Sequence, residues 1–297
     1  MTLITSTVGE WQDSDLLRFY LVGADRQTRW HFGGTGSPVR LNTPPTGVNG
    51  APVTHDYQNL VGMDGALYRG TIDEQMTIGL QVWIADRRSS SWARRQHTLW
   101  RESLGRGKDT VRLIVVSKES GYWWIDARVE SISEVNYFDQ RPGQVGEVGE
   151  LVTLVTDSSF WQRFDETRVF DRTTAPSARL TNLGDQPAWL QYMITGDHNG
   201  IEIGVGDDTV KLPDPRTLNL IEPVEGYYID TETLWPALMS TDGLNLQTLF
   251  PDAFWKKPLP PRGVQRNKAT PLTINPVNPG ADFRVEVNYT PRTEQPW

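Results

Sequence analysis

The sequence contains no cysteine among its 297 residues. Disulfides, thiolate metal sites, iron–sulfur clusters and cysteine nucleophiles are therefore excluded, and stability has to come from packing or from association with other chains. No stretch approaches the roughly 18 consecutive apolar residues that a membrane-spanning helix needs, so we expect no membrane span. Met1 to Trp11 has neither a basic start nor an apolar core, so we expect no signal peptide and folding in a cytoplasm.

The residue spacings that mark common catalytic sites are also missing. His31, His55, His97 and His198 are the only histidines, and no two have the i, i+4 spacing of a helical zinc site. We interpret His97, on an expected helix, and His198, in an expected turn, as surface residues. No Gly-x-Ser-x-Gly nucleophile elbow occurs either, so serine hydrolase chemistry has no support.

The remaining candidate motifs are better explained by local structure. Gly33–Gly36 lacks the Lys-Ser/Thr that follows a phosphate-binding loop, so we interpret it as an ordinary loop. Asp207-Asp208 and Asp165-Glu166 could supply the two carboxylates of a glycosidase. Asp207-Asp208 follows Gly206 in an expected hairpin turn, where Asp is favoured because it bonds to the nearby backbone. We therefore assign no catalytic, cofactor-binding or metal-binding residue, expect no cofactor, and do not expect an enzyme.

The sequence has fewer basic than acidic residues, with 29 Lys and Arg against 37 Asp and Glu, so its net charge is −8. A surface that binds nucleic acid needs clustered Lys and Arg to neutralise phosphates. We therefore do not expect the protein to hold DNA.

The sequence is rich in aromatic and turn-forming residues, with 12 Trp, 9 Tyr, 26 Gly and 20 Pro. Aromatic side chains suit half-buried strands, and Gly and Pro interrupt periodic segments, so the composition predicts a mainly β protein. The clearest strand spans residues 76–84, where apolar side chains alternate with Thr77, Gly79 and Gln81. One helix is expected over residues 92–104, with Ser89–Ser91 as N-cap candidates and Gly105 as its C-terminal stop.

A change to shorter, more closely spaced strands after Asp157 predicts two domains, residues 1–156 and 157–297. In the first, residues 33–67 appear as a long loop, a type of segment that is usually functional or ordered by a partner. In the second, the strands at 189–195 and 201–205 are expected to pair through a tight turn at Asn199-Gly200. With the other consecutive antiparallel strands they predict a two-sheet sandwich. The other strands expected from the pattern are 16–22, 29–32, the hairpin 111–115 and 122–129, 151–155, 189–195, 201–205, 209–212, 218–221, 227–230 and 283–289.

The second half also carries an ordered series of motifs. They are Asn182-Leu183-Gly184-Asp185-Gln186-Pro187-Ala188 before a strand ending at Gly196, then Gly226–Thr231, Phe254-Trp255, Pro258–Gly263, and the strand 283–289 with Pro291-Arg292. This series resembles the distal tail proteins, a minor tail protein family of long-tailed phages (siphoviruses) of actinobacteria. The first half is similar to the same family in its Gly-rich loop, alternating strand, Trp-bearing helix and hairpin. At the junction, Ser158-Ser159 departs from the family's commoner Asp-Pro-[Phe/Tyr]-Trp form.

The resemblance implies a tail-tube-like β-sandwich or split barrel with one helix in residues 1–156, and a galectin-like β-sandwich in residues 157–297. It implies a structural protein of the virion that forms a ring of six copies at the tail tip, assembled in the host cytoplasm. Its implied partners are copies of itself, the tail tube protein, the tape-measure protein and other tail-tip or baseplate proteins. DNA would pass through such a ring as unbound cargo, because an acidic surface offers phosphates no cations.

A carbohydrate-binding protein that recognises host cell-wall glycan stays open as the alternative. Exposed Trp and Tyr side chains on a sandwich could stack on sugar rings. Burial in a core or in a subunit interface explains the same residues, because each aromatic side chain removes roughly 150–250 Å² from water. A wall-degrading glycosidase is a third hypothesis, supported only by the available carboxylates.

Overall fold

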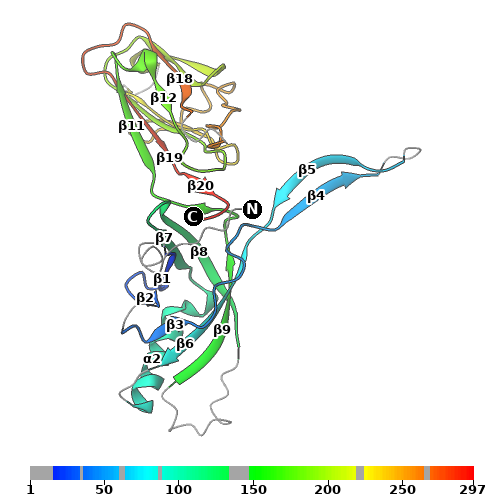
Figure 1. Ribbon diagram of the computed structural model, residues 1–297. Coiled ribbons are helices and arrows are strands. Elements are labelled where there is room, and N and C mark those ends of the chain that lie inside the picture. Colours follow the sequence, from blue (N-terminus) through cyan, green and yellow to red (C-terminus); the bar gives the residue numbers. More distant parts are fainter. Residues whose placement is uncertain are drawn as a thin grey trace, which may run out of the picture. The chain divides into compact units, whose positions relative to one another are not determined.

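The computed structural model describes residues 16–33, 36–59, 64–85, 89–133, 147–218, 224–263 and 268–297. The chain is mainly β and forms two compact units, residues 1–162 with 294–297, and residues 163–293 (Figure 1). Trp161 is fully buried in the core of the first unit and donates a hydrogen bond of 3.2 Å to the Val48 carbonyl. No helix in the described ranges is long and apolar enough to cross a membrane.

The first unit is built on one strongly curved antiparallel sheet, with strand order β2-β1-β7-β8-β9-β6-β3. The two ends of this order, β2 and β3, also contact each other, so the sheet curls into an almost closed barrel. Its strands are β1 (Arg18–Val22), β2 (Arg29–Phe32), β3 (Val39–Leu41), β6 (Thr77–Ala85), β7 (Val111–Ser117), β8 (Gly121–Ile132) and β9 (Glu147–Thr156), with β10 (Trp161–Gln162) on β8.

The alternating segment predicted from the sequence is confirmed as β6. Ile78, Leu80, Val82 and Ile84 are fully buried, and the residues between them face outward. Because successive side chains of a strand point to opposite faces, this pattern fills the barrel interior from one side of the strand.

The predicted helix is confirmed as α2 (Ser90–Ser103), the only α-helix among the described residues. Its N-cap is Ser89, whose hydroxyl accepts a hydrogen bond from the backbone N–H of Trp92. Gly105 follows the helix with φ +62°, the left-handed conformation that ends many helices, and opens the short 3-10 turn η1 (Gly105–Gly107). Trp100 is fully buried, so the helix packs into the same core as β6.

The prediction of a continuous loop over residues 33–67 is wrong. The segment contains β3 and β4 (Val53–Gln58), and β4 pairs with β5 (Leu67–Asp73) as a separate two-stranded sheet. All six residues of β4 are exposed, so no apolar alternation marks it as a strand. Residues 34–35, within the Gly33–Gly36 motif, lie outside the described residues.

The second unit is a two-sheet β-sandwich, as predicted. One sheet has the order β11-β19-β13-β16-β17 and the other β12-β18-β14-β15. Buried side chains of both sheets, such as Ile194 and Val285 from one and Ile203 and Ile274 from the other, share a single core. The strands are β11 (Glu166–Asp171), β12 (Arg179–Leu180), β13 (Gln191–Thr195), β14 (Gly200–Val205), β15 (Asp208–Pro213), β16 (Tyr227–Asp230), β17 (Ala237–Ser240), β18 (Thr270–Pro276) and β19 (Arg284–Tyr289), with 3-10 turns η2 (Ala175–Ser177) and η3 (Pro215–Thr217). The short strand β20 (Arg292–Thr293) belongs to neither of these two sheets.

One expected pairing in this unit is wrong. The segments at 189–195 and 201–205 do form β13 and β14, but these strands belong to different sheets. The chain between them crosses the sandwich: Gly196, with φ +82°, packs closely against the backbone of Asp282 and Phe283. The hairpin that follows, β14 to β15 through Gly206-Asp207, is confirmed. The strand expected at 218–221 lies mostly outside the described residues.

Candidate interaction surfaces

The hairpin β4–β5 is the most exposed regular element of the first unit. Its strands pair from Val53↔Asp73 to Gln58↔Leu67, with an irregularity between Asp56 and Tyr57. Within the described ranges, no further strand pairs with either of them. Figure 1 shows the hairpin running out from the barrel. A two-stranded hairpin alone in water is marginally stable at best, so this element lacks the support that the barrel strands have.

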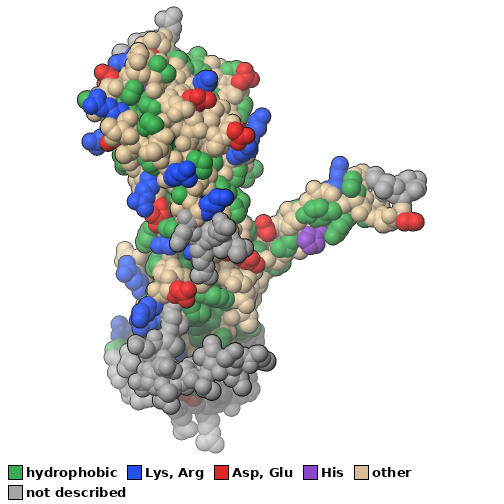
Figure 2. All heavy atoms as spheres, turned by 45° about the horizontal axis from the view of Figure 1, so that its top comes forward, with side chains coloured by type: hydrophobic (Ala, Val, Ile, Leu, Met, Phe, Trp, Pro, Cys, Tyr) green, Lys and Arg blue, Asp and Glu red, His purple; other side chains and the backbone are tan. Residues whose placement is uncertain are grey.

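The hairpin carries several large hydrophobic side chains that are exposed to solvent. Five of them are between 49% and 57% exposed: Val53, Tyr57, Leu67, Tyr68 and Ile72. Figure 2 shows hydrophobic side chains along the visible face of the hairpin. The rings of His55, Tyr57 and Tyr68 lie 5.8–6.1 Å apart, edge to face. The strand register places Val53, Tyr57 and Tyr68 on one face of the hairpin and Leu67 and Ile72 on the other, so both faces carry exposed apolar side chains. Exposed apolar side chains gathered on one element are typical of a protein–protein contact.

Backbone and side-chain hydrogen bonds fix the base of the hairpin to the barrel. The N–H of Glu74 donates to the Pro52 carbonyl at 2.9 Å, which closes the base of the strand pair. The hydroxyl of Ser159 donates to the Asp73 carbonyl at 3.0 Å. The hairpin is therefore presented from a fixed base, which lowers the entropy lost when it binds.

The prediction that His97 is a surface residue is wrong. Its side chain is 13% exposed, and its Nε2 lies 3.0 Å from the carboxylate of Glu150, which is completely buried. Trp100 Nε1 donates to the same carboxylate at 2.5 Å, and Arg101 Nε donates at 2.8 Å. These contacts join α2 to β9.

The charge of Glu150 is stabilised by these partners. Burial alone would raise the pKa of Glu150, but the hydrogen bond from His97 and the positive charge of Arg101 outweigh it and hold that pKa below its ordinary value of 4.5. The carboxylate therefore stays ionised inside the protein.

His198 is also buried, at 1% exposure, which corrects its assignment to the surface. Its Nδ1 lies 2.9 Å from the Gly196 carbonyl, and its ring packs edge to face against Phe283. His198 lies in the connection between β13 and β14, where a turn was expected, but its side chain packs into the core.

The carboxylates that could have served a glycosidase pair with nearby side chains and backbone N–H groups. Asp207 pairs with Lys257 Nζ at 2.5 Å, and this hydrogen bond lowers the pKa of Asp207. Asp208 accepts the backbone N–H groups of Lys256 and Lys257 at 2.6 and 2.8 Å. Asp165 accepts the Thr290 hydroxyl. In the part of the chain that the structure describes, no group of acidic and histidine residues could hold a metal ion.

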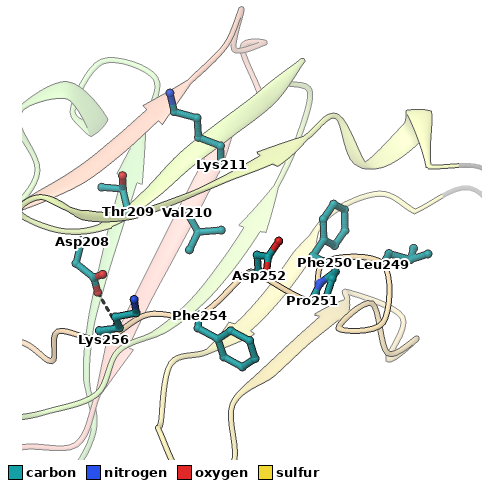
Figure 3. A pocket seen from close by; sticks show the side chains of 11 residues that line it. Asp208, Thr209, Val210, Lys211, Leu249, Phe250, Pro251, Asp252, Phe254 and Lys256 are labelled. Carbon is teal, nitrogen blue, oxygen red and sulfur yellow. Dashed lines mark hydrogen bonds between the residues drawn. The ribbon is translucent and has the colours of Figure 1, made fainter.

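The sandwich carries an open depression of about 700 Å³ between β15 and the segment 249–256. The ring of Phe254 lines it and is 48% exposed, and the side chain of Asp252 lies nearby. In Figure 3, Val210 points from β15 toward this space, and Asp208 closes one end through its hydrogen bond to Lys256. The sequence showed Phe254-Trp255 only as part of a motif, because a groove between distant segments leaves no local signal.

No protein-family model and no curated protein sequence matches the chain. Its fold, an almost closed barrel with one helix in the described part followed by a two-sheet sandwich, is similar to that of a phage Dit protein. The solved structure of the SPP1 Dit protein (gp 19.1), a paradigm of the hub adsorption apparatus in phages that infect Gram-positive bacteria, aligns with a TM-score of 0.61 and 13% identity. That alignment covers 92% of this chain and 98% of SPP1 Dit.

Two structures of the phage P2 baseplate in its activated conformation, with Ca and with Sr, align less well, with TM-scores of 0.49 and 0.48. Each has 11% identity and covers 94% of this chain and 99% of the other. The SPP1 Dit alignment spans both units, so the resemblance to distal tail proteins expected from the sequence is confirmed in the fold.

Proposed function

We propose that this chain is a structural hub protein of a long non-contractile phage tail, with six copies closing into a ring that joins the tail tube to the tail tip. The observation that carries the proposal is the β4–β5 hairpin, whose exposed apolar side chains offer a surface that a partner can cover. The Dit-type fold supports the choice of partner, because SPP1 Dit is a hub protein.

In this proposal the hairpin of each copy lies against the next copy. Covering the apolar side chains of β4 and β5 removes them from water, and the added contacts stabilise a strand pair that is marginal alone. We assign ring formation to residues 1–156 and an outward-facing role to the sandwich within residues 157–297. The other partners are the tail tube protein, the tape-measure protein and neighbouring tail-tip or baseplate proteins. The protein is not an enzyme, is assembled in the host cytoplasm, and resides in the virion.

The experiment is electron microscopy and light scattering of the purified full-length protein. Closed rings are expected for the natural sequence. The variant Tyr57→Ser, Tyr68→Ser, Ile72→Ser should remain folded but lose the rings, because it removes three exposed apolar side chains from the hairpin. Its matched control, Val169→Ser, Met193→Ser, Val277→Ser, removes three similarly exposed side chains from the sandwich and should keep the rings. Only monomers of the natural protein, both in solution and in the virion, would refute the proposal.

The open depression at Phe254 favours glycan binding as a second function, compatible with the first. Exposed aromatic rings beside polar groups suit stacking on sugars, and an open groove admits a polymer. The full-length protein is expected to show saturable binding on a glycan array, and Phe254→Ala to lose it. Absence of saturable binding by the natural protein removes this candidate, and release of reducing sugar from host wall would instead indicate a glycosidase.

A further inference from the structure

The outer face of the barrel has a second depression, of about 470 Å³, where β1, β2, β7 and β8 lie side by side. The strand register places its residues in adjoining rows: Tyr20 is opposite Ile114, and Val22 is opposite both Arg29 and Arg112. Residues directly opposite one another in a sheet point to the same face, so the register alone brings these groups together. The full lining is Tyr20, Val22, Arg26, Arg29, Arg112, Ile114, Val116 and Tyr122.

The depression has an apolar floor and an excess of positive charge at its rim. Arg112 forms two hydrogen bonds of 2.9 Å with Asp126, and Arg26 shares that carboxylate at 3.1 Å. Arg29 is exposed and forms no ion pair with the described residues. Three arginines therefore face one carboxylate on a chain whose net charge is −8. Such a site selects a ligand that combines an apolar or aromatic group with a carboxylate.

The loop between β16 and β17 has the complementary chemistry. Leu234 and Trp235 are 76% and 81% exposed, more than any other large hydrophobic side chain in the described part of the chain. Glu232, three residues before Trp235, is exposed as well.

The base of this loop is fixed although its tip is exposed. The backbone N–H and the hydroxyl of Thr231 both donate to the Leu190 carbonyl, at 3.1 and 2.8 Å. The N–H of Glu232 donates to the Asp230 carboxylate at 3.0 Å. The indole is thus presented from an ordered turn, which lowers the entropy lost on binding.

We propose that the β16–β17 loop of one copy docks in the arginine-rimmed depression of a second copy, with Trp235 entering it and Glu232 pairing with Arg29. Trp and Arg are the residues most enriched where a few contacts dominate an interface, and a guanidinium beside an indole adds cation–π attraction. A second copy is the occupant because each chain carries one loop and one depression, so a head-to-tail contact that closes uses every loop and every depression once.

This contact rests on the proposed ring and names one of its interfaces. The test compares the full-length natural protein with Arg29→Glu, Glu232→Arg and the double variant, with assembly measured by analytical ultracentrifugation. Each single variant is expected to raise the dissociation constant about tenfold or more, because it places like charges together. The double variant restores opposite charges and is expected to return to within about threefold of the natural protein.

Mixing the two single variants tests whether the contact lies between copies. In the mixture, the altered loop of one variant meets the altered depression of the other, and natural loops meet natural depressions. Assembly is therefore expected to recover, with the two variants alternating. A contact within one chain would not recover on mixing. Arg172→Glu, at another exposed arginine, is the charge control and should assemble as the natural protein does.

A separate variant tests the apolar contact that Trp235 is proposed to make. Trp235→Ala is expected to weaken assembly about thirtyfold, and Leu244→Ala, at an exposed residue of another loop, to leave it unchanged. Natural assembly in Arg29→Glu and Trp235→Ala would overturn the contact and leave the ring intact. Weakened single variants without recovery in the double variant or the mixture would also overturn it. A natural protein that never assembles would refute the proposed ring itself.

Discussion

The buried carboxylate of Glu150 shows how much of the barrel's stability rests on one side chain. It accepts hydrogen bonds from Trp100 and Arg101 and contacts His97. Glu150→Ala would leave these donors without their acceptor inside the protein. We expect it to reduce the free energy of unfolding by about 3–5 kcal/mol, measured by urea denaturation. Glu147→Ala, at the exposed start of the same strand, is the control, and an equal loss in both would contradict the assigned role.

The same residue gives a pH dependence. The folded pKa of Glu150 lies below its ordinary value of 4.5, so its contribution to stability is complete above that value and is lost as the pH falls through the folded pKa. The melting temperature of the natural protein should therefore fall in acid more steeply than that of Glu150→Gln, which cannot titrate at this position. Parallel acid profiles for the two proteins would show that Glu150 does not contribute.

Residue roles were the least predictable feature of the sequence. The sequence correctly places His97 on a helix and His198 in a connection between strands, because helix caps and glycines are local signals. It does not reveal that His198 is buried or that the side chain of His97 is only 13% exposed. His97 meets Glu150, 53 residues away, and no local pattern encodes that contact.

At the scale of elements, the end of α2 is a sensitive point. Gly105 has φ +62°, and a Cβ there would lie 2.6 Å from the Cβ of Ala24. Gly121, the first residue of β8, has φ +81° but nothing within 4 Å of such a Cβ. Both Ala substitutions carry the backbone strain of about 1 kcal/mol, and only Gly105→Ala adds a collision. Thermal denaturation should show a clearly larger loss for Gly105→Ala, and equal losses would rule out the collision.

Elements with one buried face were predictable from the sequence, and elements without one were not. β6 and α2 carry apolar side chains at the period of their own backbone, and the structure confirms both. β4 and β5 are exposed on both faces, so their residues show no such period. The pairing of β13 and β14 failed for another reason: an apolar strand has the same pattern whichever of two facing sheets it joins.

Hydrogen exchange can test the hairpin as an element. The backbone amides of β4 and β5 are expected to exchange much faster than those of β6 in dilute protein, because two exposed strands support each other poorly. At concentrations where rings form, the hairpin amides should become protected while those of β6 change little. Hairpin amides that stay equally protected at every concentration would show that it needs no partner.

At the scale of the whole molecule, the two units have separate cores. The core of the sandwich contains no residue of the first unit. We expect residues 163–293 expressed alone to fold, with the dispersed NMR spectrum and cooperative melting of a β domain. A collapsed spectrum without a melting transition would show that the sandwich depends on the barrel.

The hairpin β4–β5 also bears on how copies behave before they meet. In the proposed ring, β4 and β5 become fully ordered only when a neighbouring copy covers them, so part of the entropy cost of their ordering falls on association. In a lone copy this segment would stay vulnerable to proteases. Copies that fail to find neighbours would be degraded first. In the proposed ring, the concentration of the protein would thus decide which molecules persist, because only assembled copies would have a protected hairpin.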